Sequence, residues 1–422
     1  MTENMKPSNL CDVTLPAGWE CARFRKLFSF GKGLSITKED LVDEGVPVIS
    51  YGQVHSKANT GTAIHESLIR FVPESYLKTD KQALTQEGNF IFADTSEDLS
   101  GVGNCAFVNT PETLFAGYHS IIARPKDTNM YPKYFAYLFL TDIWRDQIRA
   151  KVMGVKVFSI SQKLLRDTTV FIPPILEQKA IANLLDTKCA KIDSVIADIE
   201  EQIETLQKYK KSLITETVTK GCTAESKTKT VRLDFADEIN EAWIETRVKY
   251  LCSMYSGDNL TSSDIEPEGD YPVYGGNGLR GFYAAYTNDG EHVLIGRQGA
   301  LCGNVHLVSG KFWATDHAVV TYPYEGTCNG YLFYLFSAMN LNQYSQTAAQ
   351  PGLAVAAIQN LSTCIPPTTE IQQEIAKYLD EKCGKIDSII EEKRKQLEIM
   401  EEHKKSLIYE YVTGKKRVTE VN

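Results

Sequence analysis

In the second half of this 422-residue chain, Arg297 and Gln298 are the residues whose types and position best fit a defined binding chemistry. They stand between Gly296 and Gly299, and glycine lets a backbone turn tightly and approach another molecule closely. Arginine and glutamine side chains can make paired hydrogen bonds to the edges of guanine and adenine. The segment therefore fits recognition of nucleic-acid bases, although a phosphate contact or a surface salt bridge would explain Arg297 equally well.

Similar polar segments occur in both halves of the chain and contain the other candidates for contact with DNA. Their hydroxyl, amide, imidazole and amine groups can hydrogen-bond base edges or phosphates. Any surface loop can have such a composition, so this signal has low specificity by itself. The candidates are Tyr51, Gln53, Thr95, Ser96, Asn104, His119 and Lys156 in the first half, and Tyr274, Gly276, Asn277, Arg297, Gln298, His317 and Gln350 in the second.

No segment carries a convincing catalytic motif. Residues 276–281 match G-x-G-x-x-G, but that dinucleotide-binding motif needs a helix after it, and residues 282–286 indicate a strand. The Gly-Lys-Gly at 31–33 lacks the spacing of a phosphate-binding loop. His119 and His317 hold matching places without a nucleophile or metal ligands nearby, which favours a structural or base-contacting role. We therefore expect no enzyme activity and no metal.

Methyltransferase motifs are absent as well. The Ile-Pro-Pro segments are not the Asn-Pro-Pro-aromatic motif of amino-methyltransferases, and no glycine-rich S-adenosylmethionine motif occurs. We expect this chain to bind no cofactor.

Two copies of one long segment must position these loops. Residues 172–221 recur as residues 365–415, with Asp186 matching Asp380 at a constant shift (380 − 186 = 194). A period of this length is far longer than the ~20–50 residues of a solenoid repeat. The chain therefore consists of two large halves, each closed by the same element.

Each copy is predicted to be a long helix. A Pro-Pro pair precedes it, and proline suits the entrance of a helix but not its interior. Apolar residues then follow at alternating spacings of four and three, the pattern of a coiled-coil seam. About 33 residues would give a rod of roughly 50 Å, and its narrow apolar stripe needs a partner. We expect the two copies to pack antiparallel. The seam consists of Ile192, Ile196, Ile199, Ile203 and Leu206 in the first copy and Ile386, Ile390, Leu397 and Met400 in the second.

Globular modules occupy the rest of the chain. In the first half, short β-type runs separated by turn residues are followed by a helical apolar pattern over 131–153, which predicts an α+β module. The second half repeats this order. The β-type runs are 46–54, 63–72, 89–93, 104–108 and 119–123. The predicted boundaries are 1–171 for the first module, 172–221 for the central helical region, 222–242 for a polar linker and the start of the second repeat, 243–364 for the second module, 365–415 for the C-terminal helical region and 416–422 for a tail.

Composition favours a cytoplasmic protein without membrane contact. No run approaches the ~18 apolar residues of a membrane span, and no signal peptide opens the chain. Ten cysteines without a C-x-x-C pair argue against disulfides and zinc. The net charge of −9 argues against indiscriminate binding to polyanions.

The two halves together resemble the specificity (S) subunit of type I restriction-modification systems over nearly the whole chain. The resemblance rests on residues 173–186, on their second copy at 366–380, and on segments 293–305 and 312–318, which are typical of the family's target-recognition domains. One departure is an extra residue after the second Pro-Pro pair, which blurs the equivalence of the Glu-Gln pair there.

The resemblance implies two pseudo-repeated target-recognition domains separated by two long antiparallel helices. Each domain would read one half of a split sequence in double-stranded DNA. The helices would bind two modification subunits that supply an S-adenosylmethionine-dependent methyltransferase, and restriction subunits would add translocation and cleavage with ATP and Mg. The second module has few cations, so we expect the modification subunits to supply phosphate contacts there. The rival hypotheses are a two-module interaction scaffold that does not bind DNA, and a nuclease or methyltransferase acting alone.

Overall fold

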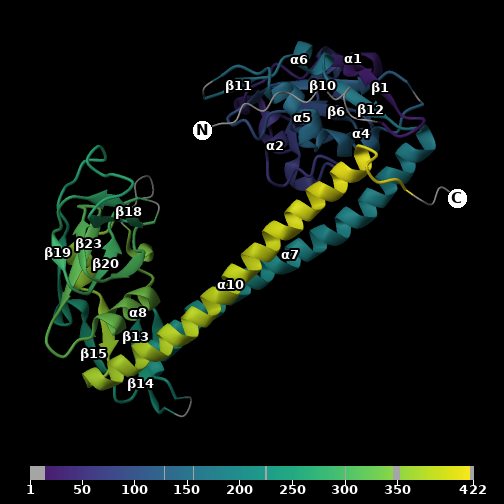
Figure 1. Ribbon diagram of the computed structural model, residues 1–422. Coiled ribbons are helices and arrows are strands. Elements are labelled where there is room, and N and C mark those ends of the chain that lie inside the picture. The colour runs from purple at the N-terminus through teal and green to yellow at the C-terminus, as the bar shows by residue number, and fades with distance from the viewer. Residues whose placement is uncertain are drawn as a thin grey trace. The chain divides into compact units, whose positions relative to one another are not determined.

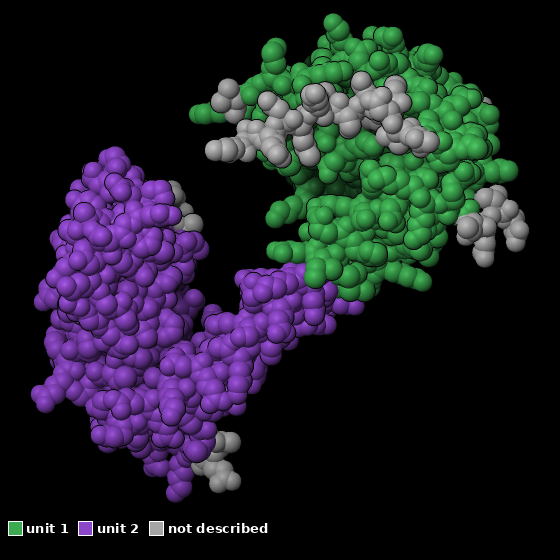
Figure 2. Space-filling view, in the orientation of Figure 1, with its two compact units in different colours: residues 1–197, 397–422 green, residues 198–396 purple. Residues whose placement is uncertain are grey.

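The computed structural model describes residues 15–127, 129–154, 156–223, 226–299, 301–345 and 352–418. The chain divides into two compact units, which Figure 2 shows in green and purple. Unit 1 contains residues 1–197 and 397–422, and unit 2 contains residues 198–396. Each unit combines a globular part with segments of two long helices, α7 (Ile175–Lys220) and α10 (Thr369–Val412) (Figure 1).

The globular part of unit 1 contains two four-stranded sheets. The first sheet is antiparallel throughout, in the order β2-β10-β6-β8, and the second has the order β4-β3-β9-β5 with β3 and β9 parallel. Two short strand pairs, β1-β12 and β7-β11, complete the unit. The strands are β1 (Glu20–Arg23), β2 (Phe28–Lys32), β3 (Val46–Ile49), β4 (Arg70–Val72), β5 (Leu84–Thr85), β6 (Phe90–Ala93), β7 (Thr95–Ser96), β8 (Cys105–Phe107), β9 (Leu114–Ala116), β10 (Ser120–Pro125), β11 (Phe158–Ser159) and β12 (Thr169–Ile172).

The helices of unit 1 cover an aromatic core. Phe24, Phe28, Phe92, Phe139 and Trp144 are buried there, with Phe139 and Trp144 ring centroids 4.4 Å apart. The short helices are α1 (Phe24–Leu27), α2 (Tyr51–Val54), α3 (Tyr76–Thr79), α4 (Pro132–Phe139), α5 (Asp142–Arg149) and α6 (Gln162–Arg166).

Three of the expected elements in unit 1 differ from the structure. The run 63–72 is a strand only over β4 (Arg70–Val72), because Glu66–Leu68 form a 3-10 turn before it. The apolar pattern over 131–153 forms two helices, because the Thr141 hydroxyl donates to the Leu138 carbonyl (2.6 Å) and ends α4. The run 46–54 is a strand only to Ile49. Ser50 then caps the helical turn α2 together with Gln53.

Unit 2 repeats this topology. Its antiparallel sheet has the order β16-β23-β20-β21, and its mixed sheet has the order β18-β17-β22-β19 with β17 and β22 parallel. The pair β15-β24 corresponds to β1-β12. The elements are β15 (Ile244–Arg247), β16 (Cys252–Ser256), β17 (Tyr271–Gly275), β18 (Gly278–Tyr283), β19 (Asn288–Asp289), β20 (His292–Gly296), β21 (Val305–Val308), β22 (Lys311–Ala314), β23 (Ala318–Pro323), α8 (Asn329–Met339), α9 (Val355–Gln359) and β24 (Ser362–Ile365).

The prediction of a polar linker at 222–242 is wrong. Residues of this segment form a β-hairpin from β13 (Thr228–Leu233) and β14 (Ala236–Asn240). Val231, Leu233 and Ile239 are buried in the core of unit 2. Val231 and Leu233 alternate with polar neighbours, which is the period of a half-buried strand. The many charged residues around them concealed that short pattern.

The long helices run antiparallel within each unit. In unit 1, Lys404 Nζ of α10 lies 2.5 Å from Asp193 Oδ1 of α7. In unit 2 the roles are exchanged, and Lys210 Nζ of α7 lies 2.7 Å from Asp387 Oδ1 of α10. With 46 and 44 residues, both helices are longer than expected. The predicted seam is buried at Ile192, Ile199, Ile386 and Ile390 and partly buried at Ile196, Ile203, Leu206, Leu397 and Met400.

The entrance of each long helix is held by a glutamine. Gln178 Nε2 donates to the Pro173 carbonyl (2.8 Å), and its Oε1 accepts from the Tyr131 N–H (2.9 Å). Gln372 makes the same two kinds of bond, to the Pro366 carbonyl (3.4 Å) and from the Cys328 N–H (2.9 Å). The glutamines are therefore equivalent despite the extra residue. Among the described residues, no helix combines the length and apolar character that a bilayer crossing requires.

Candidate nucleic-acid interface

Five of the predicted residues of unit 1 line one cavity of about 920 Å³, here named the Tyr51 cavity. They come from α2, from β7 and from the loops before β8 and β10. The five are Tyr51, Thr95, Ser96, Asn104 and His119. The fold therefore gathers polar side chains from four separate stretches of sequence on one surface.

His55 also lines the Tyr51 cavity and was missed in the sequence. The Asn104 amide donates to His55 Nδ1 (3.2 Å), so the Nε2 proton is directed at the Thr95 carbonyl (2.8 Å). His55 thus fixes the orientation of Asn104. A helical turn places His55 four residues after Tyr51 on the same face, but the expectation of a strand over 46–54 hid this spacing.

His119 lies between the Tyr51 cavity and a second one. Its Nδ1 donates to Asp94 Oδ1 (3.1 Å), and its backbone has a left-handed φ of 51°. Tyr51 packs edge to face against its ring, with centroids 5.4 Å apart. The second cavity, about 740 Å³ and here named the Lys32 cavity, is lined by Lys32, Asp94, His119 and Lys163 among others. Cations and hydrogen-bonding groups therefore lie side by side.

Arg145 brings a positive charge to the Tyr51 cavity from α5. Its Nε donates to the Phe139 carbonyl (2.8 Å), and burial lowers the pKa of the guanidinium. Asp98 also lines this cavity, and hydrogen bonds from the Ser100 hydroxyl (2.6 Å) and the Gly101 N–H (2.7 Å) lower the pKa of its carboxyl group. Arg145 was not predicted, because its position within a helix gave no indication of its exposure to a cavity.

Two predicted residues of unit 1 lie outside the residues that line this cavity. Gln53 uses its side-chain oxygen to accept from the Ser50 N–H (3.1 Å) at the start of α2. Lys156 is exposed. Their contact with DNA stays a prediction.

In unit 2, the backbones of four predicted residues converge. The Arg297 N–H donates to the His317 carbonyl (2.8 Å). A Cβ on Gly276 would lie 3.0 Å from the His317 oxygen and 3.2 Å from the Gln298 oxygen, so this close approach favours glycine. Arg297 Nη1 donates to the Ser256 hydroxyl (3.0 Å).

The remaining predicted residues of unit 2 lie near this point or outside the described chain. Asn277 is exposed and accepts from the Asn304 amide (3.1 Å) in the turn between β17 and β18. The G-x-G-x-x-G segment begins in that turn and continues into the strand β18. Tyr274 packs its ring on Phe312 at 5.8 Å. Gln350 lies outside the described residues.

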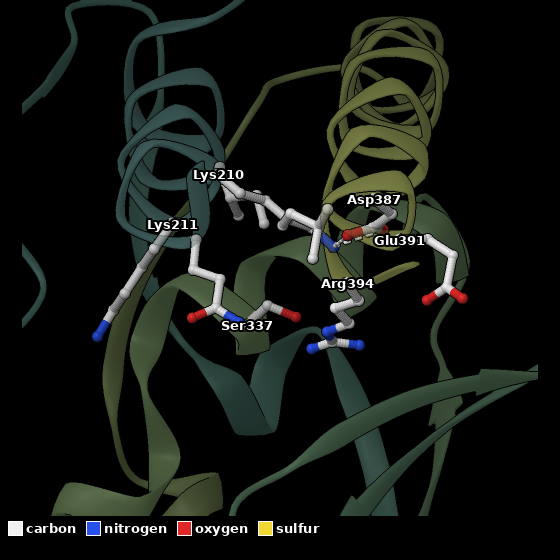
Figure 3. A pocket seen from close by; sticks show the side chains of 9 residues that line it. Lys210, Lys211, Ser337, Asp387, Glu391 and Arg394 are labelled. Carbon is white, nitrogen blue, oxygen red and sulfur yellow. Dashed lines mark hydrogen bonds and ion pairs between the residues drawn. The ribbon is translucent and has the colours of Figure 1, made fainter. Parts of the chain in front are cut away.

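A third cavity, of about 560 Å³, lies between α7, α10 and α8 in unit 2. Figure 3 shows Lys210 and Asp387 of its lining joined by their ion pair, with Ser337 and Arg394 below them. Counting by the repeat (394 − 194 = 200), Glu200 takes the place of Arg394 in the first copy. The two copies of the long helix, α7 and α10, therefore differ in charge at this position.

Comparison with known proteins points in one direction. The family model for the type I restriction modification DNA specificity domain matches residues 16–205 and 240–399. The type I restriction enzyme EcoprrI specificity subunit of Escherichia coli is 33% identical over 302 residues, which are 69% of this chain and 74% of that protein. The type I restriction enzyme MjaVIII specificity subunit of Methanocaldococcus jannaschii is 24% identical over 304 residues, covering 65% and 68%.

A solved structure shares the fold. It comes from work on the "structural basis underlying complex assembly and conformational transition of the type I R-M system", and it matches with a TM-score of 0.70 at 16% identity. The match covers 96% of this chain and 100% of that chain.

Proposed function

This chain belongs to the type I restriction-modification DNA specificity family and is a DNA-recognition subunit, and we propose that each of its units reads one half of a split DNA sequence. The repeated topology carries this proposal. Both units present loops at the same strand ends of the same pair of sheets. The side chains on those loops differ, and loops on a rigid scaffold commonly carry binding specificity.

The electrostatics of unit 1 support contact with duplex DNA. Lys32 and Lys163 line the cavity next to Asp94 and His119. Cations position a protein on the phosphate backbone, whereas polar groups between them can reach base edges. In unit 2, Arg297 is the residue that we expect to contact a base. The few cations of that module support the proposal that modification subunits supply its phosphate contacts.

We further propose that the two long helices dock two modification subunits. Val195 on α7 and Ile389 on α10 are equivalent (389 − 195 = 194), and both are exposed, at 42% and 43%. Exposed apolar side chains at matched positions fit two copies of one partner. The chain itself would be non-catalytic. It would act in the cytoplasm, where its DNA lies. S-adenosylmethionine, ATP and Mg would be bound by the modification and restriction subunits.

The test is a footprint of the assembled complex, which contains this chain and its modification subunits. Sequencing of methylated positions in cells that carry the gene cluster would first supply the target. We expect two protected segments separated by unread base pairs. Substitution in either segment should lower affinity about tenfold or more, and substitution between them should have little effect. Equal binding to target and scrambled duplexes would contradict the proposal and favour a scaffold that does not bind DNA.

A further inference from the structure

Asp94 and Arg297 occupy the same position in the two units, although their charges are opposite. Asp94 follows β6, and its N–H donates to the His119 carbonyl (3.0 Å). Arg297 follows β20, and its N–H donates to the His317 carbonyl (2.8 Å). The carbonyls of both residues also accept an N–H from a later segment, at 2.7 Å for Asp94 and 2.9 Å for Arg297. These matched bonds fix the two backbones in the same way.

The residue type also differs at a neighbouring position, the last residue of strand β2 in unit 1 and of strand β16 in unit 2. Lys32 ends β2 and pairs with Ile121, the second residue of β10. Ser256 ends β16 and pairs with Val319, the second residue of β23. Lys32 in unit 1 therefore stands where Ser256 stands in unit 2. Unit 1 has a cation at the strand end and an acid in the loop, whereas unit 2 has a hydroxyl at the strand end and a cation in the loop.

The exposed chemistry of unit 1 at this point is that of hydrogen-bond acceptors. His119 Nδ1 donates to Asp94 Oδ1 (3.1 Å), which leaves the second Asp94 oxygen and, in neutral His119, Nε2 as acceptors. Both side chains are partly exposed, His119 at 58% and Asp94 at 34%. Arg297 could contact a phosphate instead of a base. Asp94 could not, because a carboxylate repels phosphate.

We propose that Asp94, positioned by His119, accepts a hydrogen bond from the N4 amino group of a cytosine in the first half-site. This inference rests on the proposed function. Carboxylates accept from cytosine N4 in the major groove, whereas arginine donates to guanine. Adenine also offers an amino group, but its N7 acceptor lies beside it and would face the carboxylate unfavourably. The nearby Lys32 and Lys163 offset the repulsion between Asp94 and the DNA backbone.

The test replaces Asp94 with asparagine in the assembled complex. Asparagine keeps an oxygen for His119 and adds an amide donor, and asparagine pairs with adenine through N6 and N7. We expect wild type to lose affinity about tenfold or more when one C·G pair of the first half-site is changed. Asp94→Asn should lose that preference for cytosine and gain affinity for adenine at the same pair. His119→Ala should weaken the discrimination there without changing the preferred base.

Controls separate this inference from the proposed function. Asp167→Asn removes an exposed carboxylate of unit 1 that pairs with Arg25, away from both cavities, and should leave base preference unchanged. Each variant should still discriminate between duplexes that differ in the second half-site, which shows that it is folded and assembled. If Asp94→Asn weakens binding to every duplex alike, the inference is overturned and the proposed function stands. If wild type binds all duplexes alike, the proposed function itself fails.

Discussion

The helix contacts of the two units repeat, whereas the loops that face the cavities do not. Tyr137 donates to Asp186 (2.6 Å) in unit 1, and Tyr334 donates to Asp380 (2.7 Å) in unit 2. The ion pairs of Lys404 and Lys210 repeat in the same way. At the strand ends, by contrast, the equivalent residues are an aspartate in unit 1 and an arginine in unit 2. The helices have one structural task in both units, and the loops have different ones.

One difference also occurs within the helical part. The Trp19 indole donates to Glu177 (2.9 Å), which Arg417 also contacts at 2.6 Å. The equivalent Trp243 donates instead to the carbonyl of Val218 (2.9 Å). The extra residue after the second Pro-Pro pair shifts an acid away from this place, and a main-chain acceptor at the end of α7 replaces it. The repeat therefore preserves the hydrogen bond while its acceptor changes.

The largest expected effect comes from a charge in the helix seam. Ile192→Asp and Ile386→Asp each place a carboxylate at a buried position, at 7% and 6% exposure. We expect each to lower the free energy of unfolding by about 3–5 kcal/mol, because packing is lost and a charge is buried. Thermal or denaturant unfolding would measure this. Ile399→Asp, at an exposed position of α10, should cost less than about 0.5 kcal/mol. If only one of the two substitutions lowered the free energy of unfolding strongly, the two helices would not be equivalent.

The next effect distinguishes base reading from phosphate contact in unit 2. Arg297→Ala should weaken binding to the target by about 1–3 kcal/mol, roughly ten- to a hundredfold or more, and leave non-target binding nearly unchanged. Binding of the assembled complex to target and scrambled duplexes at two salt concentrations would show this. Arg247→Ala, an exposed cation on β15, is the matched control. Equal losses on both duplexes, with a salt slope reduced by about one, would mean that Arg297 contacts phosphate.

A smaller effect concerns the docking of partners. Val195→Asp and Ile389→Asp should each weaken the association of one modification subunit by about 1–2 kcal/mol, or roughly tenfold, because a charge enters an apolar contact. Native mass spectrometry would then show complexes with one modification subunit instead of two. Val195→Leu keeps the apolar character and should retain both. Undiminished two-subunit complexes in both aspartate variants would place the docking surface elsewhere.

The smallest effect belongs to the repeated ion pairs. Lys404→Ala and Lys210→Ala remove partly exposed pairs with similar geometry. Each should cost about 0.2–1 kcal/mol of stability, and the two costs should be similar. High salt should reduce both, because it screens exposed charges. Double-mutant cycles with Asp193→Ala and Asp387→Ala would measure the pairwise energies.

The long helices could be predicted because their information is local and repeated. Their length was underestimated, because the first turns of α7 bury Ile181 and Leu185 in the globular core of unit 1 instead of in the helix seam. The apolar face of the helix therefore changes between its first turns and the seam, and in the sequence this change resembles a break between two separate helices. The hairpin β13-β14 was missed for a related reason, since only three buried apolar residues identify it within a polar segment.

Much of the candidate site could be predicted by residue type, but its arrangement could not. Tyr51, Thr95, Ser96, Asn104 and His119 were identified singly, and only the fold brings them together. The equivalence of Asp94 and Arg297 rests on hydrogen bonds between residues far apart in the sequence. No local pattern contains that information.

The measurement that tests the account most directly is the sequence of methylated DNA produced by a chimera. Residues 243–364 would be exchanged for those of another specificity subunit, and methylated positions would be sequenced in cells that carry the intact gene cluster. If each unit reads its own half-site, one half of the methylated sequence changes and the other half stays the same. A change in both halves, or in neither, would contradict the account.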